Sequence, residues 1–371
     1  MSEWIDTTLG ELVSLQRGHD LPSGQRIPGS VPVVGSGGIT GWHNEAKVSG
    51  PGITIGRAAN LGVPAMVDQD FWPLNTTLYV TDFRGNNVRF AYHLFQTLDL
   101  AGFNSGSVQP MLNRNYIQSV PIKVPKRPEQ DVIAAVFGAL DKKIAVNERI
   151  AITADALADA HYCGARSNLM DLAPLGGLAH VVVGGTPSRS RAEYWSGGTV
   201  NWINSGKANE FRVIGPSEMI TEEGLSGSSV KLMPPGATLI GITGATMGQV
   251  SRLEITAGGS QNVAGVWADD PRLSDWLFYD IKARVPDLTK HASGGAQQHI
   301  NKRIILELEC GVPEADHLAA WSAKASPLLK LAAQTLVENR TLAALRDTLL
   351  PQLMSGRLRV KDAEKIVEDH T

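Results

Sequence analysis

Hydrophobic and small residues recur at alternating steps of four and three between residues 128 and 160. They are Ile133, Phe137, Leu140, Ile144, Ala151, Ala154 and Ala158, with Asn147 as the one polar interruption. This spacing predicts a single long helix with an apolar seam along one side. Pro128 suits its first turn, where a missing N–H needs no partner. At 1.5 Å per residue the helix would be roughly 50 Å long, and a seam of that length favours a partner helix.

A second stretch with the same spacing lies near the other end of the chain. Its seam comprises Leu328, Ala332, Thr335, Asn339, Leu342, Leu349 and Leu353. Residues 314–325 are also expected to be helical, and Ser326-Pro327 has the pattern of an N-cap followed by proline at the first helical position. We therefore expect a kink or a restart at Pro327 and again at Pro351. Gly356 is suited to end this helix.

Short β-prone runs separated by glycine-rich turns fill the region before the first helix. The runs are VPVV at 31–34, ITI at 53–55, TTLYV at 76–80 and SVPIKV at 119–124. They predict a compact domain with a twisted sheet. Thr8 is a candidate N-cap for a brief helix over Leu9, Leu12 and Val13.

The second half of the chain repeats the first. TTLGELVSLQRGHDLPS (7–23) is answered by APLGGLAHVVVGGTPS (173–188), and PGITIGRAANLG (51–62) by PGATLIGITGATMG (235–248). The best match has no gap: SGSVQPMLNRNYIQSVPIKVP (105–125) aligns with SGGAQQHINKRIILELECGVP (293–313). One shift of 188 pairs Gln109 with Gln297 and Asn113 with Asn301. Repeats of this size mark a duplicated unit.

The sequence thus predicts the α+β class, with two tandem domains that each precede a long helix. The boundaries are a first domain at 1–127, a first helix at 128–163, a second domain at 164–313, a second helix at 314–358 and a charged tail, short helix or disorder, at 359–371. We expect the two helices to pair as an antiparallel coiled coil. The alternative is that each helix packs only on its own domain.

Composition narrows the class of protein. A length of 371 residues with 43% hydrophobic and 19% charged residues is typical of a globular protein of two or three domains. Two cysteines, Cys163 and Cys310, fit a reducing compartment, and no apolar run is long enough to span a bilayer. These features predict a cytoplasmic protein. The net charge of −3 weighs mildly against nucleic-acid binding without excluding it.

Motifs spread over the whole chain resemble the specificity subunit of type I restriction–modification enzymes. They are Leu9-Gly10-Glu11-Leu12, the Pro128-Glu129-Gln130 opening of the first helix, YWSGGTVNWINSGK (194–207) and RDTLLPQLMSGRLRV (346–360). The first domain has QRIPGSVPVVGSGG where the second has its Tyr194-Trp195 run. The second helix lacks the Pro-Glu-Gln entry and reads Pro313-Glu314-Ala315, which affects only where that helix begins.

The resemblance implies a chain that catalyses nothing itself. Each domain would be a target-recognition domain that reads one half of a split, asymmetric sequence in double-stranded DNA. The helices would set the spacer between the half-sites and dock two methyltransferase subunits. Those partners would bind AdoMet and methylate adenine, while motor-nuclease subunits would complete the restriction complex, so this chain would hold no cofactor.

Residues that could read base edges or contact phosphate crowd the glycine-rich loops. Arg, Lys, Asn and Gln offer the hydrogen-bond pairs that distinguish base pairs in the major groove, and glycine lets the backbone approach phosphate. The first-domain candidates are Arg17, His19, Ser36, His43, Arg57, Asn60, Gln109, Asn113 and Arg114; the second-domain candidates are Arg189, Arg191, Tyr194, Asn204, Ser205, Lys207, Thr243, Thr246, Gln249, Gln297, Gln298 and Lys302. The alternative for each is a solvated loop residue. Asn113 and Asn301 are better explained as caps of turns before the strand that leads into each helix.

Enzyme motifs are missing from the sequence. Ser205-Gly206-Lys207-Ala208 imitates a phosphate loop, but Asn201 stands where the leading glycine is needed and Ala208 replaces the magnesium-binding Ser or Thr. Gly35-Ser36-Gly37-Gly38-Ile39-Thr40 fails the dinucleotide pattern at Thr40. No Asn-Pro-Pro-aromatic motif and no zinc-ligand spacing occur. A DNA-recognition subunit is therefore the leading hypothesis, a coiled-coil protein–protein scaffold the alternative, and a single-chain modifying enzyme is disfavoured.

Overall fold

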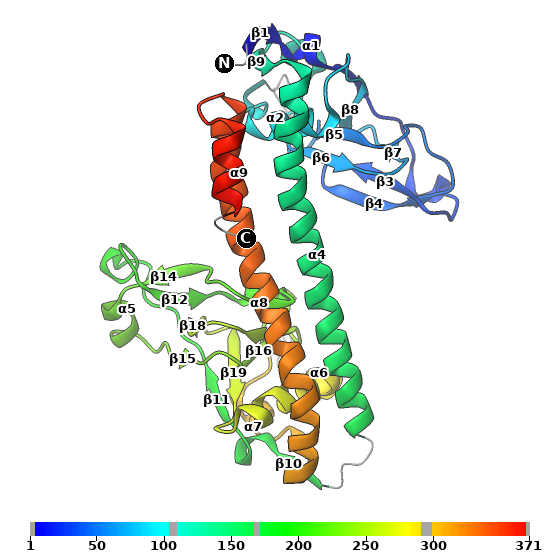
Figure 1. Cartoon of the computed structure of the whole chain (residues 1–371). Helices are drawn as coiled ribbons and strands as arrows, with labels where there is room; N and C mark the ends of the chain where they lie inside the picture. The colour runs from blue at the N-terminus through cyan, green and yellow to red at the C-terminus, as the bar shows by residue number, and fades with distance from the viewer. Residues whose placement is uncertain (1–3, 104–109, 167–170, 291–298, 369–371) are drawn as a thin grey trace. The chain divides into compact units, whose positions relative to one another are not determined.

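The structure is a computed structural model, and it describes residues 4–103, 110–166, 171–290 and 299–368. The chain forms two compact units (Figure 1). Unit 1 comprises Met1–Ala145 and Arg340–Thr371, and unit 2 comprises Val146–Asn339. Both units mix strands and helices, and two long helices each contribute residues to both units. In the part of the chain that the structure describes, no helix is both long and apolar enough to cross a membrane.

Unit 1 contains two small sheets and a strand pair. The larger sheet has the order β2 (Ser14–Arg17), β8 (Thr77–Asp82), β5 (Gly52–Gly56) and β6 (Pro64–Val67), all antiparallel. The smaller has β4 (Gly38–His43), β3 (Val31–Gly35) and β7 (Trp72–Pro73), with β3 and β7 parallel. β1 (Trp4–Thr8) pairs with β9 (Pro121–Pro125), which leads into the first long helix. The expected β-prone runs coincide with β3, β5, β8 and β9.

Short helices complete unit 1. They are α1 (Leu9–Leu12), α2 (Val88–Thr97), α3 (Arg114–Ile117) and the single 3₁₀ turns Ser23–Gln25 and Ala101–Phe103. Thr8 caps α1, and its N–H donates to the Glu11 carboxylate at 3.1 Å. Asn87 caps α2 by accepting from the Phe90 N–H. Phe90 and Leu94 of α2 share one buried cluster with Ile53 and Ile55, so α2 covers one face of the larger sheet.

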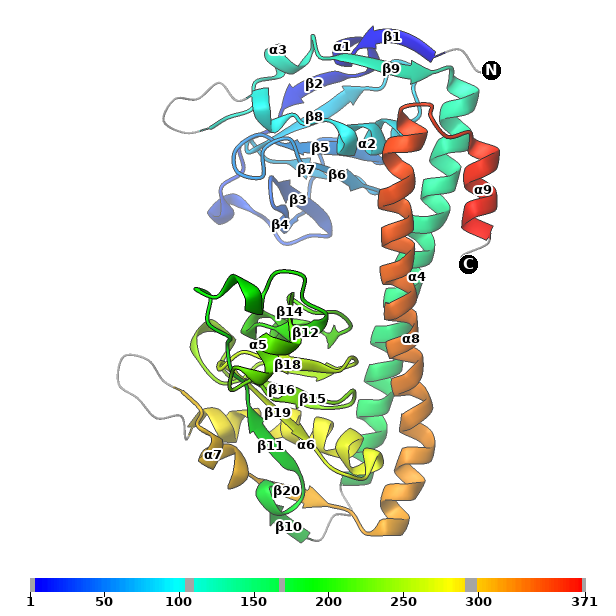
Figure 2. The ribbon, with the colours of Figure 1, turned by 90° about the vertical axis from the view of Figure 1, so that its left-hand side faces the viewer.

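Unit 2 repeats this plan with larger sheets (Figure 2). The first has the order β11 (His180–Val183), β19 (Val263–Trp267), β16 (Thr238–Gly241), β17 (Val250–Leu253) and β13 (Arg212–Val213). The second has β14 (Glu218–Ile220), β12 (Val200–Ile203), β18 (Ala257–Gly259) and β15 (Leu232–Met233). β10 (Asp171–Pro174) pairs with β20 (Glu309–Val312). The helices are α5 (Glu222–Ser226), α6 (Pro271–Lys290), α7 (Lys302–Leu306) and the 3₁₀ turns η3 (Leu175–Gly177), η4 (Ala192–Tyr194), η5 (Ser205–Asn209) and η6 (Gly244–Thr246).

The two long helices are α4 (Arg127–Arg166) and α8 (Ala315–Met354). The expected restart is wrong at both Pro327 and Pro351, because α8 runs unbroken through the two prolines. Ser326 does not cap a helix start; its hydroxyl lies 2.9 Å from the Ser322 hydroxyl and 3.4 Å from Asp275 Oδ2 on α6. Leu329, Leu349 and other buried residues around both prolines hold the helix against its neighbours, and this packing outweighs the lost backbone hydrogen bonds.

Residues of α4 and α8 share buried clusters inside each unit. In unit 1, Phe137 and Leu140 lie in one cluster with Leu342 and Leu349. In unit 2, Ala151 and Ala154 cluster with Ala332. The tail forms the short helix α9 (Val360–Glu368), whose Ala363 joins the unit 1 cluster. Gly356 lies between α8 and α9 with φ +70°, where a side chain would meet the Trp4 indole at 2.8 Å.

Candidate nucleic-acid interface

Five of the candidate residues of unit 1 line one cavity of about 660 Å³. Arg17 is the last residue of β2, Arg57 follows β5, and Arg114 opens α3. The structure therefore brings together residues from three separate segments. The other two are His19 and Asn113, and the full lining set is Gln16, Arg17, Gly18, His19, Asp20, Arg57, Leu78, Met111, Leu112, Asn113 and Arg114.

Glycine and an asparagine cap place these arginines. A side chain on Gly18 would meet the Leu74 carbonyl oxygen at 2.1 Å, so only glycine lets the strand end beside that segment. Asn113 accepts from the Asn115 N–H at 3.0 Å and so starts α3, with Arg114 as its first residue. In unit 2, Asn301 accepts from the Ile304 N–H at 3.0 Å and starts α7 in the same way. The capping explanation of both asparagines agrees with these bonds.

The guanidinium groups around this cavity have few protein partners for their number of donors. Arg17 pairs with Asp20 at 3.3 Å, Arg57 donates to the Asn75 carbonyl at 3.3 Å, and Arg114 donates to the Leu15 carbonyl at 3.4 Å. Burial, and then the charge of Arg17, lower the pKa of Arg57 from its ordinary value. Each guanidinium carries five N–H donors, so the cluster can still bind phosphate or a guanine edge.

The remaining candidates of unit 1 are held mainly by the fold. His19 Nε2 lies 3.3 Å from the Tyr79 hydroxyl. Asn60, in the left-handed region at φ +40°, donates to the Ser36 carbonyl at 3.2 Å and ties two exposed turns together. His43 is only 5% exposed, and its Nδ1 accepts from the Ile27 N–H at 3.0 Å. The structure thus gives His43 a place in the interior instead of a base contact.

In unit 2, two 3₁₀ turns bring polar candidates together. η5 carries Ser205 and Lys207, η6 carries Thr246, and the two turns pack against each other. Asn204 begins η5 by accepting from the Gly206 N–H at 2.9 Å, and Lys207 pairs with Glu210 at 2.7 Å. Thr243 precedes η6, and its carbonyl accepts from the Thr246 hydroxyl at 3.2 Å. Gln249 follows η6 and is exposed.

Arg189 and Arg191 lie apart from those turns, beside η4. Arg189 makes a two-pronged ion pair with Glu218, both bonds 2.7 Å long, and stacks 3.5 Å from the centre of the Trp195 ring. The hydrogen bonding by Arg189 lowers the pKa of the Glu218 carboxyl group. Arg191 donates to the Tyr194 hydroxyl and lies over its ring. Tyr194 is only 5% exposed. Its side chain is therefore part of the interior and not of the candidate DNA-contacting surface.

Four further candidates remain, and the structure describes one of them. Lys302 is exposed as the first residue of α7. Gln109, Gln297 and Gln298 lie outside the described residues. Sequence reasoning missed Gln16 and Asp20, which line the unit 1 cavity. Gln16 and Asp20 are the sequence neighbours of the candidates Arg17 and His19, and this adjacency was the available clue. Where residues are described, no cluster of three or more His, Cys, Asp or Glu could hold a metal ion.

The fold and the candidate surface together describe a protein of two mixed α/β units, with long helices and with arginine residues in its loops. A family model described as the type I restriction modification DNA specificity domain matches residues 1–154. The specificity subunit of the type I restriction enzyme EcoR124I/EcoR124II from Escherichia coli is 23% identical over 265 residues, which cover 67% of this chain and 65% of that protein. The HindI specificity subunit of Haemophilus influenzae is 25% identical over 194 residues, 51% of this chain and 41% of that protein.

The chain thus matches less than two thirds of the length of these curated relatives. The crystal structure of the S subunit of a type I restriction–modification system from M. genitalium has the same fold, with a TM-score of 0.66 and 14% identity over 95% of this chain and 96% of that one. Residues 1–154 thus match the DNA specificity domain, and the chain is similar to type I restriction–modification specificity subunits, the family that its motifs resemble.

Proposed function

We propose that this chain is the DNA sequence-recognition subunit of a type I restriction–modification complex. The observation that carries the proposal is the match of residues 1–154 to the DNA specificity domain. The chain catalyses nothing and holds no cofactor; AdoMet binds to the methyltransferase subunits that associate with it. Motor-nuclease subunits join the same complex for restriction.

Each unit reads one half of a bipartite, asymmetric target. The strand orders support this part of the proposal, because β2-β8-β5-β6 in unit 1 matches β11-β19-β16-β17 in unit 2. In both units an antiparallel strand pair, β1 with β9 or β10 with β20, precedes a long helix. A short helix started by Asn113 or Asn301 stands just before that pair's second strand. The same module thus accounts for both units, with different loops for different half-sites.

The helices α4 and α8 pair as an antiparallel coiled coil and set the spacer between the half-sites. Contacts inside each unit support this pairing. In unit 2, Asn147 donates to Glu338 at 2.8 Å, while Ala158 clusters with Ala325 and Leu329, so partners move backwards along α8 as α4 advances. In unit 1, Asp141 pairs with Arg346 at 3.0 Å. The outer faces of the same helices dock two methyltransferase subunits.

The arginine cavity of unit 1 is the proposed reading site for its half of the target. Arg17, Arg57 and Arg114 present guanidinium groups that suit the O6 and N7 of guanine or the backbone phosphates. In unit 2, Lys207 of η5 and Gln249, which follows η6, contact the other half of the target. A good bidentate contact contributes about 1–3 kcal/mol of discrimination, so a few contacts in each unit suffice for a specific site.

Salt dependence tests DNA binding against the alternative, a coiled-coil scaffold without DNA, which the net charge of −3 would suit. We expect the affinity of the assembled complex for DNA to fall steeply with salt, with a log–log slope of about 0.9 per neutralised phosphate. A flat dependence, or binding without preference among sequences, would favour the scaffold.

The length of the helices tests the spacer. Removing or adding one heptad within residues 133–158, with the matching change in α8, should alter the number of base pairs between the half-sites. Adenine methylation maps of cells that express each variant give this number directly. An unchanged spacer would contradict the role of the helices.

A further inference from the structure

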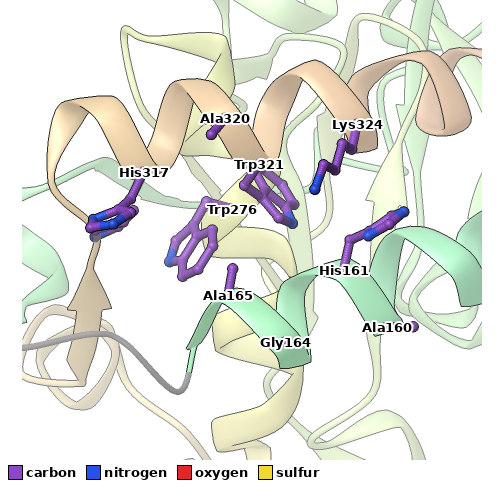
Figure 3. A pocket seen from close by; sticks show the side chains of 10 residues that line it. Ala160, His161, Gly164, Ala165, Trp276, His317, Ala320, Trp321 and Lys324 are labelled. Atoms are coloured by element: carbon purple, nitrogen blue, oxygen red, sulfur yellow. The ribbon is translucent and has the colours of Figure 1, made fainter.

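A cavity of about 320 Å³ in unit 2 lies between the end of α4, α6 and the beginning of α8 (Figure 3). Small residues leave it open, and two tryptophans form its apolar wall. Its polar lining consists of His161 from α4 and His317 and Lys324 from α8. The full lining is Ala160, His161, Gly164, Ala165, Trp276, Pro313, His317, Ala320, Trp321 and Lys324.

The two tryptophans of this cavity differ in one respect. Their rings pack edge to face with centres 5.1 Å apart. Trp276 donates its indole N–H to the Gly311 carbonyl at 2.9 Å. Trp321 is 3% exposed, yet its buried Nε1 finds no acceptor among the residues that the structure describes. A buried donor without an acceptor is unfavourable, so this N–H marks a place for an acceptor.

The charges around the opening indicate which acceptor fits. Figure 3 shows the nitrogen of the Trp321 ring on the side that faces Lys324 and His161. Lys324 is exposed, and within the described ranges it forms no ion pair. The lining contains no Asp or Glu. The site therefore offers a cation and hydrogen-bond donors with no anion of its own, and a bound carboxylate would satisfy both.

We propose that this cavity receives the carboxylate of an Asp or Glu side chain from the methyltransferase subunit. The carboxylate accepts the Trp321 N–H and pairs with Lys324, while its methylene groups lie against the indole rings. The identity of the partner rests on the proposed function; the chemistry of the cavity does not.

Carbodiimide cross-linking of the assembled complex tests the pairing directly. The reagent joins a lysine amine to a carboxylate in contact with it, and mass spectrometry identifies both residues. We expect an adduct between Lys324 and an acidic residue of the methyltransferase subunit, and its loss in Lys324→Arg, which keeps the charge but lacks the amine. Lys330, exposed on the same helix, is the control and should give no such adduct. An adduct with a second copy of this chain would contradict the proposed partner.

Affinity measurements with two matched tryptophan variants complete the test. Trp321→Phe removes the N–H together with part of the ring, and we expect it to weaken association with the methyltransferase subunit roughly tenfold. Trp276→Phe makes the same change in the neighbouring buried ring and also removes a hydrogen bond within the chain, so we expect it to lower the melting temperature of the free chain more than Trp321→Phe does. The proposal fails if Trp321→Phe and Lys324→Met both associate as the unmodified chain does and no Lys324 adduct forms.

DNA binding by the same complexes separates this proposal from the proposed function. A complex that assembles through the cavity but binds DNA without sequence preference would overturn the function alone. Sequence-selective DNA binding with normal assembly of the Trp321→Phe and Lys324→Met variants would overturn the cavity alone.

Discussion

The two units attach their part of α4 in different ways. Unit 1 uses a neutral amide, because Gln130 is buried and makes three hydrogen bonds. Its Oε1 accepts from the Asn87 N–H at 3.0 Å, and its Nε2 donates to Asn86 Oδ1 at 2.8 Å and to the Pro125 carbonyl at 2.9 Å. The glutamine of the Pro-Glu-Gln motif thus links α4 to β9 and to the start of α2.

Unit 2 holds the last part of α4 with buried charges. Asp155 of α4 pairs with Arg212 of β13 at 2.5 Å and accepts from the Tyr279 hydroxyl at 3.0 Å. Arg212 also contacts Glu254. Arg252 bridges Glu254 and Asp275, each at 2.6 Å. Although burial opposes it, the charges of these two carboxylates raise the pKa of Arg252.

The two units therefore hold α4 with two kinds of contact, a neutral amide in unit 1 and buried ion pairs in unit 2. At the position related to Gln130 by the shift of 188, unit 2 has Leu318, which packs in the cluster of Trp276 and Trp321. A neutral amide that loses its partners leaves a few unsatisfied groups, whereas a buried ion cluster that loses one member leaves an uncompensated charge. Unit 2 should therefore be more sensitive than unit 1 to single substitutions at its junction with α4.

The largest effect is expected from Arg212→Met in unit 2. The variant leaves Asp155 and Glu254 buried without this partner, and the free energy of unfolding of unit 2 should fall by about 3–5 kcal/mol. Hydrogen exchange of β13 and β17 measures this loss, and exchange of β5 and β8 reports unit 1. The exposed pair of Arg303 and Glu307 is the control, where Arg303→Ala should change stability by less than about 1 kcal/mol. Equal effects of the two substitutions would refute the buried network.

A smaller loss is expected from Gln130→Leu, which gives unit 1 the residue that unit 2 has. The substitution leaves the Asn87 N–H and two acceptors without their partner, so unit 1 should lose about 2–3 kcal/mol. Urea unfolding followed through exchange of α2 tests this value. Gln130→Glu, which keeps the shape of the side chain but loses both N–H donors, serves as a second variant. No loss with either would show that the amide does not hold α4.

Substitutions in the candidate DNA-contacting surfaces of the two units should also differ in their effect on DNA binding. The guanidinium of Arg57 in unit 1 donates one hydrogen bond to the chain, to the Asn75 carbonyl, so Arg57→Ala should weaken specific DNA binding roughly tenfold and relax one half-site. Arg189 of unit 2 is already engaged by Glu218 and Trp195, so Arg189→Ala should have a weaker effect on DNA and should change the fluorescence of Trp195. Competition binding with half-site mismatches checks both, and an effect of Arg57→Ala on both half-sites would contradict the assignment.

The smallest expected effect is a pH dependence confined to unit 1. Burial lowers the pKa of His93, against the hydrogen bond between its Nδ1 and the acceptor Gln96 Oε1 and against the charge of Asp141; Arg346 and Arg89 also lower it. The unfolded chain then binds a proton on this ring more readily than the folded chain. The contribution of His93 to stability is complete above the unfolded pKa, about 6.5, and falls as the pH decreases through that value toward the folded pKa.

Unit 2 lacks this group, because the shift of 188 places Ile281 at the position of His93. Hydrogen exchange at pH 7.5 and 5.5 should show α2 of unit 1 losing protection more than α6 of unit 2. His93→Gln should remove most of that difference. Equal losses in the two helices would mean that His93 is not their cause.

Patterns that are local in the sequence predicted most of the secondary structure. The seam of α4, the strands β3, β5, β8 and β9 and the capping role of Asn113 and Asn301 follow from spacing and residue type. The continuity of α8 through Pro327 did not follow, since it depends on packing by residues of other segments.

The contacts between distant segments were beyond prediction. Arg212 and Asp155 are 57 positions apart, and Tyr279 and Asp155 are 124 apart, so no spacing rule connects them. The same reason explains His43 and Tyr194. Their polar type and glycine neighbours indicated a surface role, but burial is decided by strands and turns that pack on them from elsewhere. Loop residues from separate segments, such as Arg17 and Arg114, likewise meet only in the folded unit.

The central claim is that the two units are copies of one recognition module and that each unit reads a separate half-site. Adenine methylation mapping tests it most directly, in cells whose complex carries either the native chain or a chain with residues 17–125 exchanged for the matching segment of a relative. We expect a split target in both cases, with one half altered by the exchange and the other half and the spacer unchanged. A change in both halves, or in neither, would contradict the claim.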